Sequence, residues 1–384
     1  MKIVVALDSF KGSCSAKEAC EAVAMGIKNY IPDANTILCP VSDGGEGLID
    51  TLYPILKSMG YEKYSKEVTG PYLKKVVAHY LKKDNYCILE MAQCSGLELE
   101  VKEKRNCLDA TTYGLGELLD YVISKGCTDI KVGLGGSATN DAGIGFAQAL
   151  GAKFYTDDGC EIKHILCAKD IQSVARVDTE ALDKKLKGIN VYGTCDVNNT
   201  LIGKNGATYV FGPQKRLDLN LLDKIDNDIK YLASMLDKHY MLDVVNTKGS
   251  GAAGGLGAAL IWYCKGELKP GIDVVMEILS LEDHIKDSSL VIVGEGRMDG
   301  QSVQGKAPLG VASVAKKYSV PVVSICGSIA SDAKVLYKNN IDAMFSICDG
   351  PMPLEKAMAN TKALLEKTSE NVIRLIGQSQ RIKL

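Results

Sequence analysis

The sequence predicts an α/β protein with two unlike α/β domains. At both ends of the chain, short apolar runs alternate with polar loops and helical segments, whereas the middle has shorter strand-like runs and glycine-rich loops. Strand, polar loop, helix and strand in succession are typical of a parallel sheet. We expect a doubly wound, flavodoxin- or Rossmann-like parallel-sheet domain from residues 1–66 and 278–384. An inserted α/β domain with a mixed sheet should cover residues 67–277.

The first repeat of this pattern opens the chain. Ser15 and Glu18 match a capping box, so a helix should begin there and run to about Asn29. Apolar runs on either side of it are interpreted as strands, and each is followed by a polar loop. The expected strands are residues 3–7 and 36–41, and the loops are residues 8–13 and 42–47, the second loop leading into another helix.

The later elements follow in the same way. Three strands near the C-terminal end are expected at residues 289–293, 321–326 and 343–348, and a long amphipathic helix should begin near Leu354. In the middle, the turn signal at residues 83–85 joins two strand-like runs at 76–81 and 86–91. A further strand at 129–132 should precede a helix that ends near Leu150.

Composition excludes several classes of protein. The 384 residues carry a net charge of −2, with 46% apolar and 24% charged residues, so no global charge favours nucleic acid or an anionic membrane. The longest uncharged run, between Lys248 and Lys265, is too short and glycine-rich for a transmembrane helix. No secretory signal is visible, and we expect a cytoplasmic protein. Thirteen cysteines without a CxxC pair favour reduced, buried thiols, and four scattered histidines argue against zinc.

A glycine-rich loop at residues 133–141 is the first candidate for chemistry. It lies between an expected strand and an expected helix, and a helix N-terminus binds anions well. Glycines let the backbone approach a ligand closely, and Thr139, Asn140 and Asp141 add side-chain acceptors. The alternative is a tight strand-to-helix turn in which Thr139 or Asn140 is the helix cap.

Two formal pattern matches are interpreted as false. Residues 249–254 fit GxGxxG, but no clear strand precedes them and no acidic residue follows at the expected distance. Residues 300–307 nearly fit a Walker A loop, but Ala307 stands where a Mg²⁺-binding serine or threonine is required. Both segments can still line a ligand cleft.

Acidic residues recur after the expected strands. They are Asp8, Asp43, Glu46, Asp196, Glu295 and Asp299. Ligands of open α/β sheets bind beyond the carboxyl ends of the strands. Carboxylates at that edge, with Lys11 and Arg297 close in sequence, fit a Mg²⁺–nucleotide site, because the basic groups offset phosphate charge. The alternative for any one of these residues is a turn or a cap.

Six motifs follow one another along the chain. They are VALDSFKGS (5–13), SDGGEG (42–47), GLGGSATNDAG (133–143), CDVNNTLIGKNGA (195–207) with FGPQK (211–215), GSGAAGGLGAAL (249–260) and VGEGRMDGQSVQGKAPLGVA (293–312). Taken together in this order, they resemble the type I glycerate kinases of bacteria. The resemblance covers residue 3 to about residue 330. Two departures, Thr200 after Asn199 and Arg216 after Lys215, stand where the family usually has proline and glycine, and they put local loop shape in doubt.

The resemblance implies ATP, Mg²⁺ and D-glycerate, with phosphoglycerate as product. We favour 2-phosphoglycerate over 3-phosphoglycerate. It also implies an active cleft between the two domains. The expected partners are these small molecules, with no nucleic acid and no membrane, and the expected state is a monomer or homodimer.

The same resemblance suggests a role for each site residue. Asp196 is the proposed proton acceptor, with Asp43 and Glu46 as alternatives, while Lys11 and Arg297 hold the glycerate carboxylate or the transferred phosphoryl group. The substrate-binding set is Asp8, Ser9, Lys11, Glu46 and Asp299. The nucleotide-binding set is Gly135, Gly136, Ser137, Asn140, Asp141 and Lys306. The metal-binding set is Asp43, Asp196 and Glu295.

Two other functions compete with this interpretation. GLGGSAT is similar to the phosphate loop of the galactokinase–homoserine kinase superfamily, but that reading explains one motif and leaves five unused. A non-enzymatic sensor of small anions would normally carry a DNA-binding or signalling module, and no basic helical segment is evident.

Overall fold

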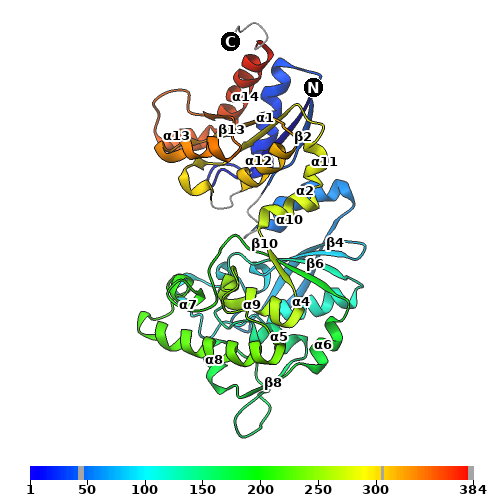
Figure 1. Ribbon diagram of the computed structural model, residues 1–384, viewed down its shortest axis with the longest axis vertical. Helices are drawn as coiled ribbons and strands as arrows, with labels where there is room; N and C mark the ends of the chain where they lie inside the picture. The colour runs from blue at the N-terminus through cyan, green and yellow to red at the C-terminus, as the bar shows by residue number, and fades with distance from the viewer. Residues whose placement is uncertain (42–46, 304–306, 379–384) are drawn as a thin grey trace. The chain divides into compact units, whose positions relative to one another are not determined.

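The computed structural model describes residues 1–41, 47–303 and 307–378, and the chain forms two compact units (Figure 1). The first unit comprises Met1–Asp43 and Pro270–Leu384, and the second comprises Gly44–Lys269. These boundaries differ from the expected ones at 66/67 and 277/278. The reason is pairing, since strand β3 (Glu62–Thr69) joins the sheet of the second unit and helix α10 (Gly271–Ile278) packs on the first.

The first unit contains an entirely parallel five-stranded sheet in the order β15-β13-β11-β1-β2. Its strands are β1 (Lys2–Leu7), β2 (Asn35–Leu38), β11 (Leu290–Gly294), β13 (Val322–Cys326) and β15 (Ala343–Ser346). Counted along this unit, the spatial order is 2-1-3-4-5, the flavodoxin-like arrangement. The predicted doubly wound domain built from both chain ends is confirmed.

Helices cover both faces of this sheet. Helices α1 (Ala16–Tyr30) and α14 (Thr361–Gln378) pack together over alternating strand residues such as Val5 and Ile292. Helix α12 (Ala307–Lys317) packs on β1, β11 and β13, and it contacts α10 and α11 (Leu281–Ile285). Central strands buried on two faces must be apolar throughout, which explains why they appear in the sequence as continuous apolar runs.

Helix α1 begins as its sequence predicts. The Ser15 hydroxyl accepts a hydrogen bond from the Glu18 amide, and the Glu18 carboxylate accepts one from the Ser15 amide at 3.0 Å. The expected single C-terminal helix is instead two helices, α13 (Leu354–Ala359) and α14, because Asn360 leaves the helical conformation between them.

The second unit contains a mixed six-stranded sheet in the order β10-β9-β6-β5-β4-β3. Beside β3 its strands are β4 (Lys75–Lys83), β5 (Tyr86–Glu90), β6 (Asp129–Gly133), β9 (Asn190–Thr194) and β10 (Glu267–Lys269). The strands from β10 to β5 are parallel, whereas β5, β4 and β3 form an antiparallel meander. The predicted mixed sheet is confirmed.

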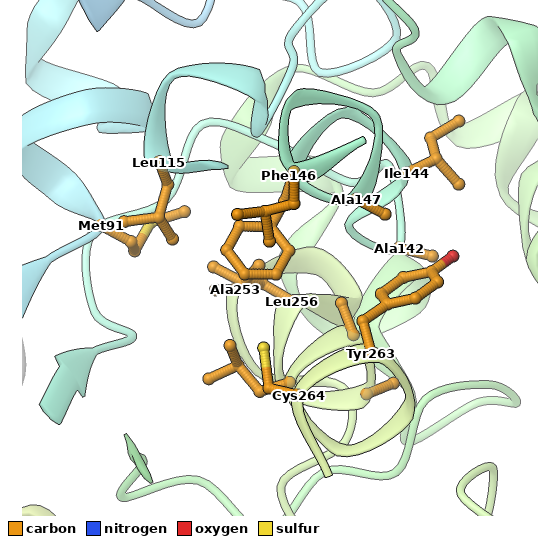
Figure 2. Close-up of a cluster of buried hydrophobic side chains, with 14 of the residues drawn as sticks. Met91, Leu115, Ala142, Ile144, Phe146, Ala147, Ala253, Leu256, Tyr263 and Cys264 are labelled. Carbon is orange, nitrogen blue, oxygen red and sulfur yellow. The ribbon is translucent and has the colours of Figure 1, made fainter. Parts of the chain in front are cut away.

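The main core of the second unit lies between this sheet and its larger helices. These are α4 (Tyr113–Ser124), α5 (Ile144–Leu150), α8 (Leu222–Tyr240) and α9 (Ala252–Cys264). Figure 2 shows Phe146 of α5 beside Leu256 of α9. Every residue of α9 except Ile261 is buried, as expected for a helix that is apolar on all sides. Helix α2 (Leu48–Leu56) packs on β4 and β5.

The remaining elements are short. They are α3 (Ala92–Ser95), α6 (Glu180–Leu186), α7 (Ala207–Phe211), β7 (Lys153–Tyr155), β8 (Arg176–Asp178), β12 (Arg297–Met298) and β14 (Ser328–Ile329). All thirteen cysteines lie in the described ranges as free thiols, with Cys160 and Cys348 exposed and most of the others buried. Within those ranges, no helix is both long enough and apolar enough to cross a bilayer.

Candidate functional site

A cavity of about 750 Å³ lies at the carboxyl ends of β1 and β11 in the first unit. The loops that follow these two strands line it, at Asp8–Lys11 and at Glu295–Asp299. The chain leaves β1 toward β2 on one side and continues from β11 to β13 and β15 on the other, so the cavity lies at the topological switch point. Open α/β sheets bind their ligands at such a point.

Backbone hydrogen bonds hold three loops together at this end of the sheet. The Asp8 amide donates to the Gly294 carbonyl at 2.8 Å, and the Gly327 amide donates to the Glu295 carbonyl at 3.1 Å. A Cβ atom on Gly327 would lie 2.3 Å from the Gly296 carbonyl oxygen, so only glycine permits this approach. The cavity wall is therefore fixed by backbone contacts between neighbouring strand ends.

Two carboxylates of the cavity share one buried serine. The Ser302 hydroxyl donates to Glu295 at 2.9 Å and accepts from the Asp299 amide at 3.2 Å, and the Ser302 amide donates to the Asp299 carboxylate at 3.2 Å. Ser302 has no exposed surface. The expected substrate residue Asp299 and the expected metal residue Glu295 are thus brought together, with Asp8 lining the same cavity.

These carboxylates fit a Mg²⁺ ion that is also bound by substrate. In the described residues, no group of three or more histidine, cysteine, aspartate or glutamate side chains is placed to hold a metal ion by itself. Mg²⁺ is commonly held by one or two carboxylates together with phosphate oxygens and water. The pair of Glu295 and Asp299 provides that number of protein ligands.

Positive charge lies at the same end of the cavity. The Arg297 side chain is 70% exposed, and its Nε is 3.7 Å from an Asp299 oxygen. Lys11 is exposed and also lines the cavity, as does the half-buried Ser9. The structure therefore brings together six of the expected residues, which are Asp8, Ser9, Lys11, Glu295, Arg297 and Asp299. Mixed charge of this kind suits a ligand with metal-bound phosphates.

Part of the cavity wall is apolar, and an amphipathic helix was the available sequence signal for it. We call this part the apolar wall, and it consists of Phe10, Ile347, Met352, Leu354, Ala357 and Met358. The Ser13 hydroxyl donates to the Met358 carbonyl at 2.6 Å, which ties the first loop to the end of α13. Five of the six wall residues lie beyond the last motif at residue 312.

The glycine-rich loop of the second unit is longer than expected. It leaves β6 at Gly133, and α5 begins only at Ile144, after Gly143 with its left-handed φ of +71°. Neither Thr139 nor Asn140 caps the helix, contrary to the alternative drawn from the sequence. Gly135 and Gly136 are half-buried, and Ser137 is buried.

The side chain of Asp141 lies just before α5 and is held by hydrogen bonds within the second unit. Its carboxylate accepts from the Thr112 amide at 2.9 Å, from the Thr112 hydroxyl at 2.8 Å and from the Gly143 amide at 3.2 Å. Burial raises the pKa of Asp141, and these hydrogen bonds oppose that rise. Because Asp141 and Asn140 have no exposed surface, the prediction that their side chains contact a nucleotide does not fit this geometry.

Lys215, the last residue of FGPQK, has a position that sequence reasoning missed. It is 2% exposed, and its ammonium donates to the Ser137 hydroxyl and the Thr139 carbonyl, each at 2.6 Å. Burial lowers the pKa of Lys215 to about 8. Its place in the FGPQK motif was the available signal, but only the fold shows that Lys215 contacts the glycine-rich loop.

Three motifs of the second unit converge at the ends of β6 and β9. The Ala142 amide donates to the Gly254 carbonyl at 3.0 Å, and the Gly251 amide donates to the Asn199 carbonyl at 3.0 Å. Asp196 is exposed two residues beyond β9, the neighbour of β6. The structure therefore places Asp196 and the glycine-rich loop at adjacent strand ends.

Three expected site residues, Asp43, Glu46 and Lys306, lie outside the described residues. At the end of the motif at residues 42–47, the buried carboxylate of Glu90 accepts from the Gly47 amide at 2.6 Å and from the Ile49 amide at 3.3 Å. Sequence reasoning missed Glu90, although an acidic residue that ends an apolar strand-like run was a usable signal.

Comparison with known proteins assigns the family. The model of the glycerate kinase family matches residues 3–377. The chain belongs to this family. It is 42% identical to glycerate kinase from Bacillus subtilis, covering 97% of each chain, and 42% identical to glycerate 2-kinase from Escherichia coli, covering 99% of each. A crystal structure of a candidate glycerate kinase 2 from Salmonella typhimurium LT2 covers 100% of both chains, at 38% identity and a TM-score of 0.87.

The family match has two consequences. This member of the family is a kinase, so the non-enzymatic sensor is set aside. The match also covers all six motifs, so the likeness of GLGGSAT to a phosphate loop of another kinase superfamily is local.

Proposed function

We propose that this kinase transfers the γ-phosphate of ATP to the 2-hydroxyl of D-glycerate and releases 2-phosphoglycerate. The observation that carries the proposal is identity of about 40% to glycerate kinases over nearly the whole chain. The choice of the 2-hydroxyl is supported by the Escherichia coli relative, which is named glycerate 2-kinase. The polar end of the first-unit cavity has the charges that a phosphorylated acid and its metal need.

In this proposal, the first unit binds the charged parts of the substrates. Lys11 and Arg297 hold the glycerate carboxylate or the transferred phosphoryl group. Asp8 and Asp299 accept hydrogen bonds from the substrate, and the Ser9 hydroxyl accepts or donates one. Phosphoryl transfer depends mainly on positioning and on stabilising charge. Cations placed where charge develops in the transition state supply that stabilisation.

Glu295 would hold magnesium. Asp299 lies beside Glu295, because both carboxylates form hydrogen bonds with Ser302. Asp43 and Asp196 remain the other proposed ligands. When bound, Mg²⁺ neutralises charge on the phosphate oxygens. The fit rests on the donor set, because hard carboxylate oxygens are the ligands that Mg²⁺ prefers.

The second unit would supply the base and part of the phosphate site. Asp196 is the proposed acceptor of the hydroxyl proton, and Asp43 and Glu46 stay as alternatives. Gly135, Gly136 and Ser137 are proposed to meet nucleotide phosphates through the backbone, because Lys215 already occupies the Ser137 hydroxyl. Lys306 keeps its proposed nucleotide role, whereas the buried Asn140 and Asp141 are left out.

A coupled assay of ADP release tests the reaction. We expect turnover that requires both ATP and D-glycerate, with galactose and homoserine as control alcohols. Absence of turnover with glycerate, together with turnover on either control, would overturn the proposal.

Proton-coupled ³¹P NMR of the product tests which hydroxyl is phosphorylated. Phosphorus on the 2-oxygen couples to a single carbon-bound proton and gives a doublet. Phosphorus on the 3-oxygen couples to a methylene group and gives a triplet, and that result would replace 2-phosphoglycerate by 3-phosphoglycerate.

A further inference from the structure

We infer that the apolar wall of the first-unit cavity binds the adenine base of the nucleotide. The inference rests on the proposed function, which requires ATP, and adds a location for the base. The expected nucleotide residues lie in the second unit or outside the described residues, and the polar end of the cavity was expected to hold glycerate. The apolar wall has no role in those assignments.

The size of the cavity suits a nucleotide better than glycerate alone. Its volume of about 750 Å³ is far more than a three-carbon acid fills. Cavities of about 300–1,000 Å³ are typical of ligands of drug size. A nucleotide is in that class, and glycerate alone would leave most of the cavity as water against an apolar surface.

The lining of the cavity combines charged and apolar side chains. Lys11, Arg297 and the carboxylates Asp8, Glu295 and Asp299 line the same cavity as the apolar wall. A nucleotide has the same combination, since its base is flat and largely apolar on its faces and its phosphates are charged. Methionine is flexible and polarizable, and Met352 and Met358 can therefore adapt to the face of a ring.

The cavity also lies where this type of fold binds nucleotide-like ligands. In flavodoxin-like sheets, the crevice beside the first and third strands of the fold is where nucleotide-like ligands bind. β1 and β11 are those strands here, and the loops after them carry the polar end of the cavity.

The wall is held firmly enough to recognise a ligand. The Ser13 hydroxyl donates to the Met358 carbonyl at 2.6 Å, and the Thr361 hydroxyl donates to the same oxygen at 3.1 Å. A Cβ atom on Gly12 would lie 2.9 Å from the terminal methyl of Met358, so the first loop packs directly on the wall. The end of α13 and the start of α14 are thereby fixed to the loop after β1.

An exposed cysteine in the lining provides a direct test. Cys348 is exposed and lines the cavity, and Cys160 is exposed in the second unit, outside this cavity. The full-length protein is alkylated with N-ethylmaleimide in the presence of adenosine, ADP or D-glycerate. The rate at each cysteine is read by peptide mass spectrometry, with Cys160 as the internal control.

We expect adenosine and ADP to slow alkylation of Cys348, by about tenfold at a ligand concentration ten times Kd, and to leave Cys160 unchanged. Protection by D-glycerate alone, with none from adenosine, would overturn the inference. So would the absence of protection by any ligand in an enzyme that turns over normally. Protection by adenosine in a protein without glycerate-dependent turnover would support the base site and contradict only the proposed function.

A matched pair of variants adds a kinetic test. Leu354 is 74% exposed in the wall, and Leu375 is 54% exposed on α14 outside this cavity, so Leu354→Asp and Leu375→Asp should both fold. We expect Leu354→Asp to raise KM for ATP about tenfold, which corresponds to losing about one apolar contact to the base, with KM for glycerate unchanged. Leu375→Asp should change neither constant. An unchanged KM for ATP in Leu354→Asp, or a rise confined to glycerate, would contradict the inference.

Discussion

Lys215 places an ammonium group in the interior of the second unit, where it donates to Ser137 and Thr139. Burial lowers the pKa of Lys215 from its ordinary 10.5 to about 8. Between these two pH values the unfolded chain keeps a proton that the folded protein has lost. The contribution of Lys215 to the free energy of unfolding therefore rises with pH in this window. The destabilising cost of burying the charged ammonium group is fully present below pH 8.

The variant Lys215→Met tests this behaviour. We expect the difference in free energy of unfolding, wild type minus variant, to rise between pH 8 and pH 10.5 by at most about 1.4 kcal/mol per pH unit. The reason is that the variant has no proton to lose at this position. Urea denaturation at several pH values across the window measures it, and a difference that stays constant would contradict the shifted pKa.

Asp141 is the second residue whose role depends on its burial. In Asp141→Asn, one carboxylate oxygen that accepts from Thr112 or Gly143 becomes an NH₂ group, which faces another donor. We expect a loss of about 1–3 kcal/mol in the free energy of unfolding. Asp109→Asn, at an exposed ion pair with Lys169, is the control and should lose little. Urea denaturation measures both variants. Equal losses of unfolding free energy in Asp141→Asn and Asp109→Asn would show that burial gives Asp141 no special role.

At the scale of elements, the start of α9 shows how the loops are locked together. Ala253, Gly254 and Gly255 all have left-handed φ values, and a Cβ atom on Gly254 would lie 2.0 Å from the Thr139 carbonyl oxygen. The glycine-rich segment at residues 249–260 therefore serves close packing against the loop at 133–143. It is not a dinucleotide fingerprint, in agreement with the interpretation of the sequence.

Two glycine variants separate backbone strain from steric overlap. Gly126 has a left-handed φ of +83° with open space around it, so Gly126→Ala should lower the free energy of unfolding by about 1–2 kcal/mol. Gly254→Ala, with a φ of +68°, should lose a further 1–3 kcal/mol or so because the new methyl group displaces the Thr139 backbone. Urea denaturation compares them. Similar losses in both variants would show that the close approach is easily relaxed.

Sequence patterns predicted the strands of the first unit well and the glycine-rich loop of the second unit poorly. The apolar runs that became β1, β11 and β13 are buried on both faces, so their composition alone marks them. The loop after β6 was mispredicted because the positions of Asp141 and Gly143 depend on Thr112, which is distant in sequence. The break between α13 and α14 was also missed.

At the scale of the whole molecule, the motifs divide between the two units. Residues 5–13 and 293–312 belong to the first unit, and residues 133–143, 195–215 and 249–260 belong to the second. If a single reaction uses both sets, then a change in either unit must lower the same turnover.

Two variants test this requirement, Arg297→Met in the first unit and Asp196→Asn in the second. Because both side chains are exposed, both variants should fold. We expect each to lower kcat/KM for glycerate by about 100-fold or more, through lost charge stabilisation or a lost base. Arg374→Met on α14 is a control for loss of surface charge and should keep full activity. Near-normal kcat in Asp196→Asn would contradict its role as the base, and full activity in either site variant would remove that unit from the proposed chemistry.

The sequence by itself determined the family, the parallel and mixed sheets and most of the residues at the polar end of the cavity. These features are encoded locally, in short motifs and in the apolar composition of buried strands. Only the tertiary structure decided that Asn140, Asp141 and Lys215 are interior, that Glu295 and Asp299 share Ser302, and that the apolar wall lines the same cavity. Burial and enclosure depend on neighbours that are far apart along the chain, and no local pattern records which neighbours those are.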